Sequence, residues 1–326
     1  MICRYEDVSW FTVATKQKYR FLIDVPLAGP RLVTNSIRIQ HYVPRFYLQN
    51  FSNKQGDAFL INCFDKTSQK IFRVNIENVA AESYFYDTDK YTNQLVEKSL
   101  GRHESEFNEA HRKMLKVKNY RALKKKERMS LLFFMSSQEI RTREMRESLK
   151  DMVQQIHKRL SRERLSDDLR EQIEEARTDA AIKDLHVRVL VEDVPKFVAI
   201  MAQMKWVLMQ NRTSMPFWTS DHPVNRFNPV VHKPYGSLGL VKTGINIYFP
   251  LSPSLVLCLC DPIFYRMLPD KVDVTDEEEV IFQNHLQVNY STRHLFSPTN
   301  DFALAKKMIS ENADLSDVTR KRHEVT

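Results

Sequence analysis

Glycine is scarce in this chain, with 6 glycines in 326 residues, about 2% where globular proteins average ~7%. Dinucleotide-binding and P-loop proteins need closely spaced glycines that let the backbone cradle phosphates. Neither the Gly-x-Gly-x-x-Gly fingerprint nor a Walker loop occurs among Gly29, Gly56, Gly101, Gly236, Gly239 and Gly244. The sequence therefore disfavours dinucleotide binding and P-loop phosphoryl transfer.

Cysteine is also sparse, and Cys3, Cys63, Cys258 and Cys260 are scattered. Four cysteines are too few to cross-link a chain of this length into a disulfide framework, and Cys-x-Cys is not the spacing of a zinc knuckle. In a strand, Cys258 and Cys260 would share one face. We therefore expect a reducing, cytoplasmic location. The sequence identifies no metal ligand and leaves any cofactor unknown.

Long apolar runs are missing too. No run of about 18 apolar residues occurs, so we expect no transmembrane helix and no membrane partner. An apolar stretch does not follow Arg4, so we expect no secretory signal. The 42% hydrophobic content allows one large core or two smaller ones, and oligomeric state stays open.

Positive charge is abundant and local. The chain has a formal net charge of +8, while residues 111–164 alone hold 17 Lys or Arg and 6 Asp or Glu. Such a segment can follow a nucleic-acid backbone, or it can be a solvated helical face. The candidate nucleic-acid contacts are Lys113, Lys116, Arg121, Lys124, Lys125, Lys126 and Arg128.

The most distinctive stretch is residues 40–51, QHYVPRFYLQNF, which mixes aromatic side chains with a histidine, an arginine and amides. Pro44 favours extended backbone before it and a helical turn after it. His41 would then lie just ahead of a short helix that carries Arg45. Two more polar residues, Gln138 and Arg141, continue a helical apolar stripe backward, so we expect both to be buried.

A third polar group follows the apolar stretch 217–220, which we read as a strand that ends at Asp221 and His222 in a Pro-marked turn. A capping box predicts a helix over 276–290, rich in amide side chains. Asn284 and Asn289 on that helix are candidate binding residues.

These segments carry a resemblance to a known family. QHYVPRFYL at 40–48 with Phe51, Gln138 with Arg141-Thr142, FWTSDHPV at 217–224 and FPLSP at 249–253 resemble the bacterial family called domain of unknown function 4238. The similarity spans roughly residues 38–300. The family often has Asn where this chain has His222. The resemblance implies a family and brings no activity with it.

The candidate site joins the three motifs. His41 could act as a general acid or base, with Asp221 orienting it, and Arg45, Gln138 and Arg141 could bind substrate. The alternative is structural: Arg141 and Asp221 form a buried ion pair. Known nuclease patterns are weak, because Pro269-Asp270-Lys271 lacks a strand-borne Glu-x-Lys and Pro229 breaks the helix that an Arg226–His232 pair would need.

We predict an α+β fold, a small mixed β-sheet formed by N- and C-terminal segments with a large helical insertion at 94–211. Residues 1–36 form an extension, 37–311 a single domain and 312–326 a polar tail. Strands are expected at 58–64, 70–74 and 84–87, and a helix at 191–210. Three functions stay open: a hydrolase or nuclease acting on nucleic acid or nucleotides in a defence or toxin setting, a sensor of a polar or anionic ligand, and a helical scaffold.

Overall fold

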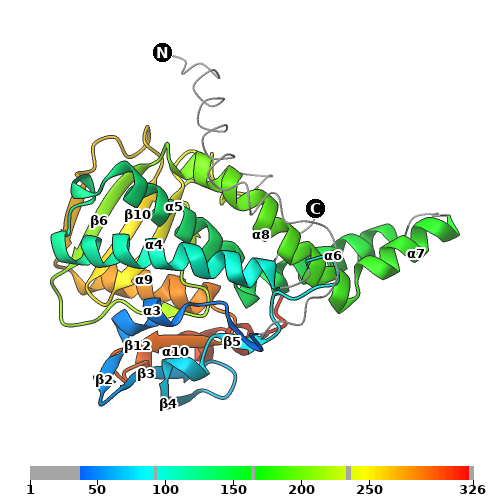
Figure 1. The fold of residues 1–326 in the computed structure, drawn as a ribbon, viewed down its shortest axis with the longest axis horizontal. Helices are drawn as coiled ribbons and strands as arrows, with labels where there is room; N and C mark the ends of the chain where they lie inside the picture. Colours follow the sequence, from blue (N-terminus) through cyan, green and yellow to red (C-terminus); the bar gives the residue numbers. More distant parts are fainter. Residues whose placement is uncertain (1–36, 92–93, 163–165, 233–235, 323–326) are drawn as a thin grey trace.

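The structure is a computed structural model that describes residues 37–91, 94–162, 166–232 and 236–322. These residues form an α+β fold, as predicted (Figure 1). In place of one small sheet, the described residues hold two five-stranded sheets and a two-stranded ladder. The 1–36 extension lies outside the described residues.

The first sheet is built from the N- and C-terminal segments, as predicted. Its strands run in the order β2-β3-β12-β7, and β4 pairs with β3. All of its pairings are antiparallel, and the predicted hairpin joins β3 to β4. The bounds are β2 Asn53–Gln55, β3 Ala58–Asp65, β4 Lys70–Asn75, β7 Thr219–Ser220 and β12 His294–Ser297.

A separate ladder holds the start of the first motif. β1 (Ile39–His41) pairs with β5 (Ala81–Ser83). The strand that we expected at 84–87 is wrong, because Tyr84 has a φ of 51°, and this left-handed conformation ends an extended strand. The strand therefore lies three residues earlier.

The second sheet has the order β11-β6-β10-β9-β8, with β11 parallel to β6 and the other pairs antiparallel. Both faces of β10 are buried. Leu255, Leu257 and Leu259 join the core shared with the helical region, while Val256, Cys258 and Cys260 face the opposite core with Val280. The two thiols thus share a face, as predicted. The bounds are β6 Lys205–Asn211, β8 Asn225–Phe227, β9 Asn246–Ser252, β10 Leu255–Cys260 and β11 Lys271–Val274.

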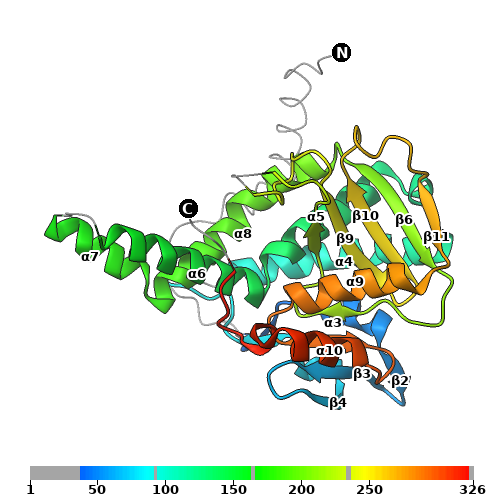
Figure 2. The ribbon, with the colours of Figure 1, turned by 180° about the vertical axis from the view of Figure 1, so that it is seen from behind.

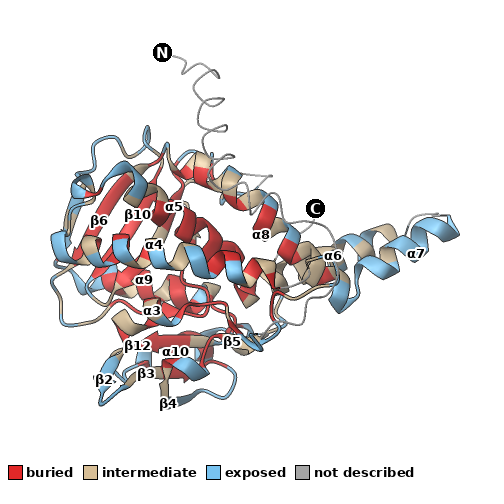
Figure 3. Cartoon of the chain, in the orientation of Figure 1, coloured by how far each residue is buried: buried red, intermediate tan, exposed pale blue. Residues whose placement is uncertain are grey.

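Helices cover both faces of this second sheet (Figures 1 and 2). α4 and α5 lie over one face and α9 over the other, between the two sheets. α6 and α7 project away from the sheets, and α7 is exposed along its length (Figure 3). The bounds are α3 Arg45–Leu48, α4 Leu95–Val117, α5 Lys125–Ile140, α6 Arg143–Leu160, α7 Asp167–Ala176, α8 Asp179–Met201, α9 Glu277–Tyr290 and α10 Ala303–Glu311.

The helix that we expected over 191–210 is wrong at both ends. α8 begins at Asp179, contains Pro195, and ends at Met201, while residues 205–211 form β6. Trp206 and Leu208 of β6 pack into one core, and Val207 and Met209 pack into the core on the other face. Both faces of β6 are therefore buried, and its sequence lacks the alternation that marks a half-exposed strand. A short apolar run of this kind does not distinguish a strand from a helix. The helical insertion therefore stops before residue 205.

Candidate functional site

The first and third motifs meet, as predicted. Tyr47 on α3 is fully buried, and its hydroxyl lies 2.8 Å from the Thr219 hydroxyl on β7. The same hydroxyl donates to the Pro250 carbonyl at 2.7 Å. Because the Tyr47 proton goes to Pro250, the Thr219 hydroxyl donates to Tyr47.

The second motif joins the other two at the end of α5. The Gln138 amide donates to the Tyr42 carbonyl at 2.8 Å, and Arg141 Nη2 donates to the His41 carbonyl at 2.8 Å. Thr142, the N-cap residue of α6, contacts the third motif through its Oγ1, which lies 2.7 Å from His222 Nδ1. Gln138 and Arg141 are both buried, which confirms their predicted burial.

Arg141 finds its acidic partner on α4. Its Nη1 lies 2.8 Å from Glu104 Oε1, and its Nε donates to the Tyr86 hydroxyl at 3.1 Å. The ion pair with Asp221 that we considered is not formed, because α4 packs along α5 and brings Glu104 to the guanidinium. Glu97, seven residues earlier, is half-buried; burial, together with the charge of Glu104, raises its pKa to about 7 against the opposing charge of Arg141.

Asp221 is bonded to a turn of the backbone. Its carboxylate accepts N–H groups from Thr292, Arg293 and His294, each at 2.8 Å, and Asp221 is 1% exposed. These bonds fasten the end of β7 to the start of β12. The arrangement suits a structural carboxylate, because three fixed donors already occupy its oxygens.

His41 and Arg45 lie on the outer side of the first motif. His41 Nε2 lies 3.2 Å from the Glu77 carbonyl, so this nitrogen carries the proton. Burial, and then the charge of Arg45, lowers the pKa of His41 to about 4, which makes the ring neutral near pH 7. Arg45 is exposed and pairs with Glu77 at 3.2 Å.

Arg45 borders a cleft of about 520 Å³ between α3, β3 and α4. Three carboxylates line this cleft, from Asp57, Glu77 and Glu104, against the single cation of Arg45. This charge balance disfavours an anionic substrate in the cleft.

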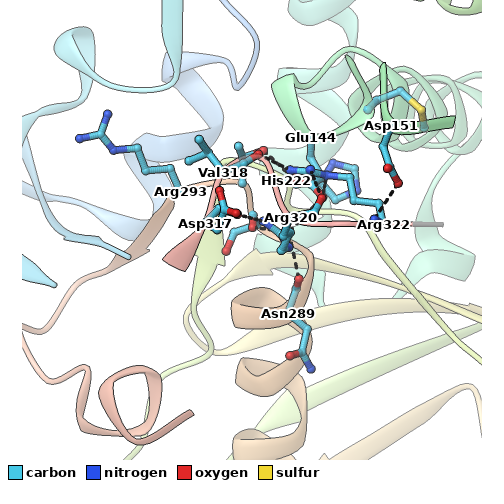
Figure 4. A network of polar contacts seen from close by, with 12 residues as sticks. Glu144, Asp151, His222, Asn289, Arg293, Asp317, Val318, Arg320 and Arg322 are labelled. Carbon is cyan, nitrogen blue, oxygen red and sulfur yellow. Dashed lines mark hydrogen bonds and ion pairs between the residues drawn. The ribbon is translucent and has the colours of Figure 1, made fainter. Parts of the chain in front are cut away.

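The two candidate asparagines of α9 differ in their surroundings. Asn284 is buried; it accepts the Trp218 N–H at 2.8 Å and donates to the Pro216 carbonyl at 3.1 Å. Asn289 is exposed, and its carbonyl accepts a hydrogen bond from Arg320 at 3.3 Å (Figure 4). They do not converge on one ligand position.

The basic residues of 112–128 lie where α4 ends, the chain turns at 120–122, and α5 begins. Three of them are in ion pairs: Lys113 with Glu127 at 2.8 Å, Lys126 with Glu106 at 3.1 Å, and Arg121 with Asp270. In the described part of the chain the others have no ion pair, namely Arg112, Lys116, Lys118, Lys124, Lys125 and Arg128.

Sequence reasoning missed a buried network centred on Glu144 of α6 (Figure 4). Glu144 lies 2.7 Å from Arg322 Nε and 3.0 Å from Arg320 Nη2, and it accepts the Thr292 hydroxyl at 2.7 Å. Burial opposes the negative charge, but Arg322 and Arg320 outweigh it and lower the pKa of Glu144. The expected polar tail is thus bonded to the domain as far as Arg322.

Lys66 is a second residue that the sequence did not single out. It is 0% exposed, and its Nζ donates to the carbonyls of Val288 and Ser291 at 2.8 and 2.7 Å, at the end of α9. A turn residue between two strands gives no signal that its ammonium will cap a distant helix.

Within the described ranges, no three His, Cys, Asp or Glu side chains are grouped as metal ligands would be. Among the same residues, no helix has the length and apolar character to cross a membrane.

Comparison with known proteins gives one result. No curated protein and no solved structure matches the chain. A family model described as "Protein of unknown function (DUF4238)" matches residues 39–301, which include all three motifs. The chain therefore belongs to the DUF4238 family.

Proposed function

We propose that this protein binds nucleic acid through the basic end of the α4–α5 pair, defined as Arg112, Lys116, Lys118, Lys124, Lys125 and Arg128. The observation that carries the proposal is the contrast within 112–128. Three cations of this segment hold the turn through ion pairs, while these six have no ion pair in the described part of the chain. Unpaired cations grouped on one end suit a row of phosphates.

The surroundings favour a duplex over a single strand. Proteins that bind single strands stack bases on exposed aromatic rings beside their cations. Tyr120, the aromatic residue of this turn, packs on Trp206 with ring centroids 5.4 Å apart. Its ring face is therefore engaged, and the basic end is suited to the phosphate backbone of a duplex.

The proposal is for binding without cleavage. The polar groups of Asp221, Arg141 and Thr142 are bonded to their neighbours in the motif junction. Groups held in this way support the packing of the three motifs more directly than they support a reaction.

The proposal is tested with a labelled 30-base-pair duplex and the variant Lys116→Gln/Lys124→Gln/Lys125→Gln. Losing three phosphate contacts should weaken binding at least tenfold. The matched control is Lys54→Gln/Lys70→Gln/Lys306→Gln, which removes the same charge from exposed positions on β2, β4 and α10 and should bind as the wild type does.

Two results would contradict the proposal. One is the absence of duplex binding by the wild type. The other is an equal loss of duplex affinity in the two triple variants, which would show that the effect depends on net charge alone. Duplex cleavage with Mg²⁺ that is lost in Asp221→Ala, in protein shown to be folded, would restore the nuclease hypothesis.

A further inference from the structure

The loop that joins β10 to β11 presents apolar side chains to solvent. Four of the six residues at 263–268 are large, apolar and exposed, namely Ile263, Phe264, Met267 and Leu268. Ile263 is 77% exposed and Met267 is 86% exposed. Apolar residues that are exposed singly are ordinary, but a cluster of them marks a surface that contacts another molecule.

Hydrogen bonds fix the backbone that carries these side chains. The Asp261 carboxylate accepts two backbone N–H groups at the start of the loop, at 2.8 and 3.2 Å. Tyr265 points inward, where its hydroxyl donates to the Gly244 carbonyl at 3.2 Å and accepts the Asn246 amide at 2.6 Å. The loop is thus bonded to the second sheet at its start and at its middle, while its apolar side chains stay outside.

This loop lies beside the basic end of the α4–α5 pair. Arg121, in the turn between α4 and α5, forms an ion pair with Asp270, which follows the loop. Met267 is three residues from Asp270, and Lys124 is three residues from Arg121, so the backbone spans at most about 10 Å in each case. The loop and the basic end are therefore close enough to contact the same turn of a duplex, which is ~34 Å long.

We propose that the loop is a wedge that enters the minor groove of duplex DNA, parts two stacked base pairs and bends the duplex. The inference rests on the proposed function, because the basic end must hold the duplex. Proteins that bend DNA in this way insert side chains such as Ile, Met, Phe or Leu between base steps and use Arg or Lys in the same groove. The loop has this combination, since the exposed Arg266 lies between Ile263 and Met267 in the chain.

Two other partners fit the loop less well. A stable interface with a second copy of the chain buries about 800 Å² on each partner, which is more than a six-residue loop supplies. An anionic lipid surface also attracts apolar and cationic side chains, but surface-bound proteins commonly bury one face of an amphipathic helix there. Residues 262–267 form turns and no helix.

The test is fluorescence energy transfer between dyes at the two ends of a 30-base-pair DNA duplex. Wild-type protein should raise the transfer efficiency when it binds, because a bend brings the two ends closer together. Ile263→Ser/Met267→Ser keeps every cation of the basic end, so its affinity for the duplex should fall less than tenfold. Its rise in transfer at saturation should be less than half that of the wild type.

The matched control is Ile156→Ser/Leu169→Ser, which removes two exposed apolar side chains from α6 and α7. Once both variants are shown to be folded, the control should bind and bend the duplex as the wild type does. An equal loss of bending in the control would overturn the wedge, because the effect would not belong to the loop.

Failure of the wedge can be told from failure of the proposed function. Duplex binding by the wild type without any rise in transfer, or with an equal rise in Ile263→Ser/Met267→Ser, overturns the wedge and leaves the basic end as the binding surface. The absence of duplex binding contradicts the proposed function and the wedge together.

Two further outcomes would assign the loop to another partner. One is wild-type binding to vesicles of anionic phospholipid that Ile263→Ser/Met267→Ser loses while it still bends the duplex. The other is a wild-type dimer, seen by analytical ultracentrifugation, that becomes a monomer in this variant and still bends the duplex. Either result overturns the wedge.

Discussion

The hydroxyl groups of Tyr47 and Thr219 lie 2.8 Å apart in the buried interior, although 172 residues separate them in the chain. This bond joins the short helix of the first motif to the strand of the third. The Pro250 carbonyl, which also accepts from Tyr47, adds the segment at 249–253 to the same junction.

This junction predicts a measurable coupling. Tyr47→Phe should lower the free energy of unfolding by about 2 kcal/mol, because it removes a buried hydroxyl that is hydrogen-bonded to both the Thr219 hydroxyl and the Pro250 carbonyl. A double-mutant cycle with Thr219→Val should give a coupling of about 1 kcal/mol by urea denaturation. Tyr84→Phe, at an exposed ring, is the control and should change little. Strict additivity of the two buried changes would show that the bond contributes nothing.

Arg141 should be a stabilising residue. Arg141→Gln removes a buried guanidinium that bonds Glu104, Tyr86 and the His41 carbonyl. Breaking a buried pair typically costs about 3–5 kcal/mol. Because Glu104 is partly exposed, we expect Arg141→Gln to lower the free energy of unfolding by about 3 kcal/mol. Arg143→Gln, at a half-exposed side chain, should cost less than about 1 kcal/mol. Similar urea midpoints for the two variants would contradict the assignment.

Asp221→Asn tests whether the carboxylate is structural. An asparagine has one acceptor oxygen, and its NH₂ group would face N–H donors of residues 292–294, so we expect a loss of about 2–4 kcal/mol. Asp57→Asn on the surface should unfold as the wild type does. If Asp221→Asn has wild-type stability, the three backbone hydrogen bonds do not stabilise the fold. A chemical role would then explain the presence of Asp221 better.

Acid should destabilise the protein through three histidines whose pKa is lowered in the folded state. Burial lowers the pKa of His111 and of His41 to about 4, and burial with the charge of Arg146 lowers that of His186 to about 3. His111 Nε2 donates to the Leu251 carbonyl at 2.8 Å, and its buried Nδ1 has no hydrogen-bond partner among the residues that the structure describes. A second proton there would have no acceptor.

The unfolded chain takes up these protons below its ordinary histidine pKa of ~6.5, while the folded chain does so only near the lowered values. Stability should therefore fall as pH drops from about 6.5 toward 4, by roughly 1.4 kcal/mol per pH unit for each histidine. Urea denaturation of wild type and His111→Gln across this range should show a shallower slope in the variant. A wild-type stability that stays flat from pH 6.5 to 4.5 would contradict the prediction.

Local patterns allowed part of this fold to be predicted. The aromatic 40–51 motif, the β3–β4 hairpin and α9 each have turn or capping signals in adjacent residues, and the apolar stripe on the helical region correctly placed Gln138 and Arg141 inside. β6 was missed because a strand buried on both faces has no alternation.

The interaction partners of the site residues could not be predicted from the sequence, because they depend on the tertiary structure. Glu97 and Glu104 share a helical face, but nothing in the sequence says that this face meets Arg141. The bonds of Glu144 to Arg320 and Arg322 span more than 170 residues. Asp221 is saturated by backbone N–H groups, which no side-chain pattern can reveal.

The most direct test of the proposed function is the salt dependence of duplex binding, measured by fluorescence anisotropy. If about five phosphates contact the basic end of the α4–α5 pair, the slope of log Kobs against log salt should be about −4 to −5, from roughly −0.9 per contact. In Lys116→Gln/Lys124→Gln/Lys125→Gln the slope should be shallower by about 2 to 3. A slope that this variant leaves unchanged, or binding that does not respond to salt, would contradict the proposal that this surface binds nucleic acid.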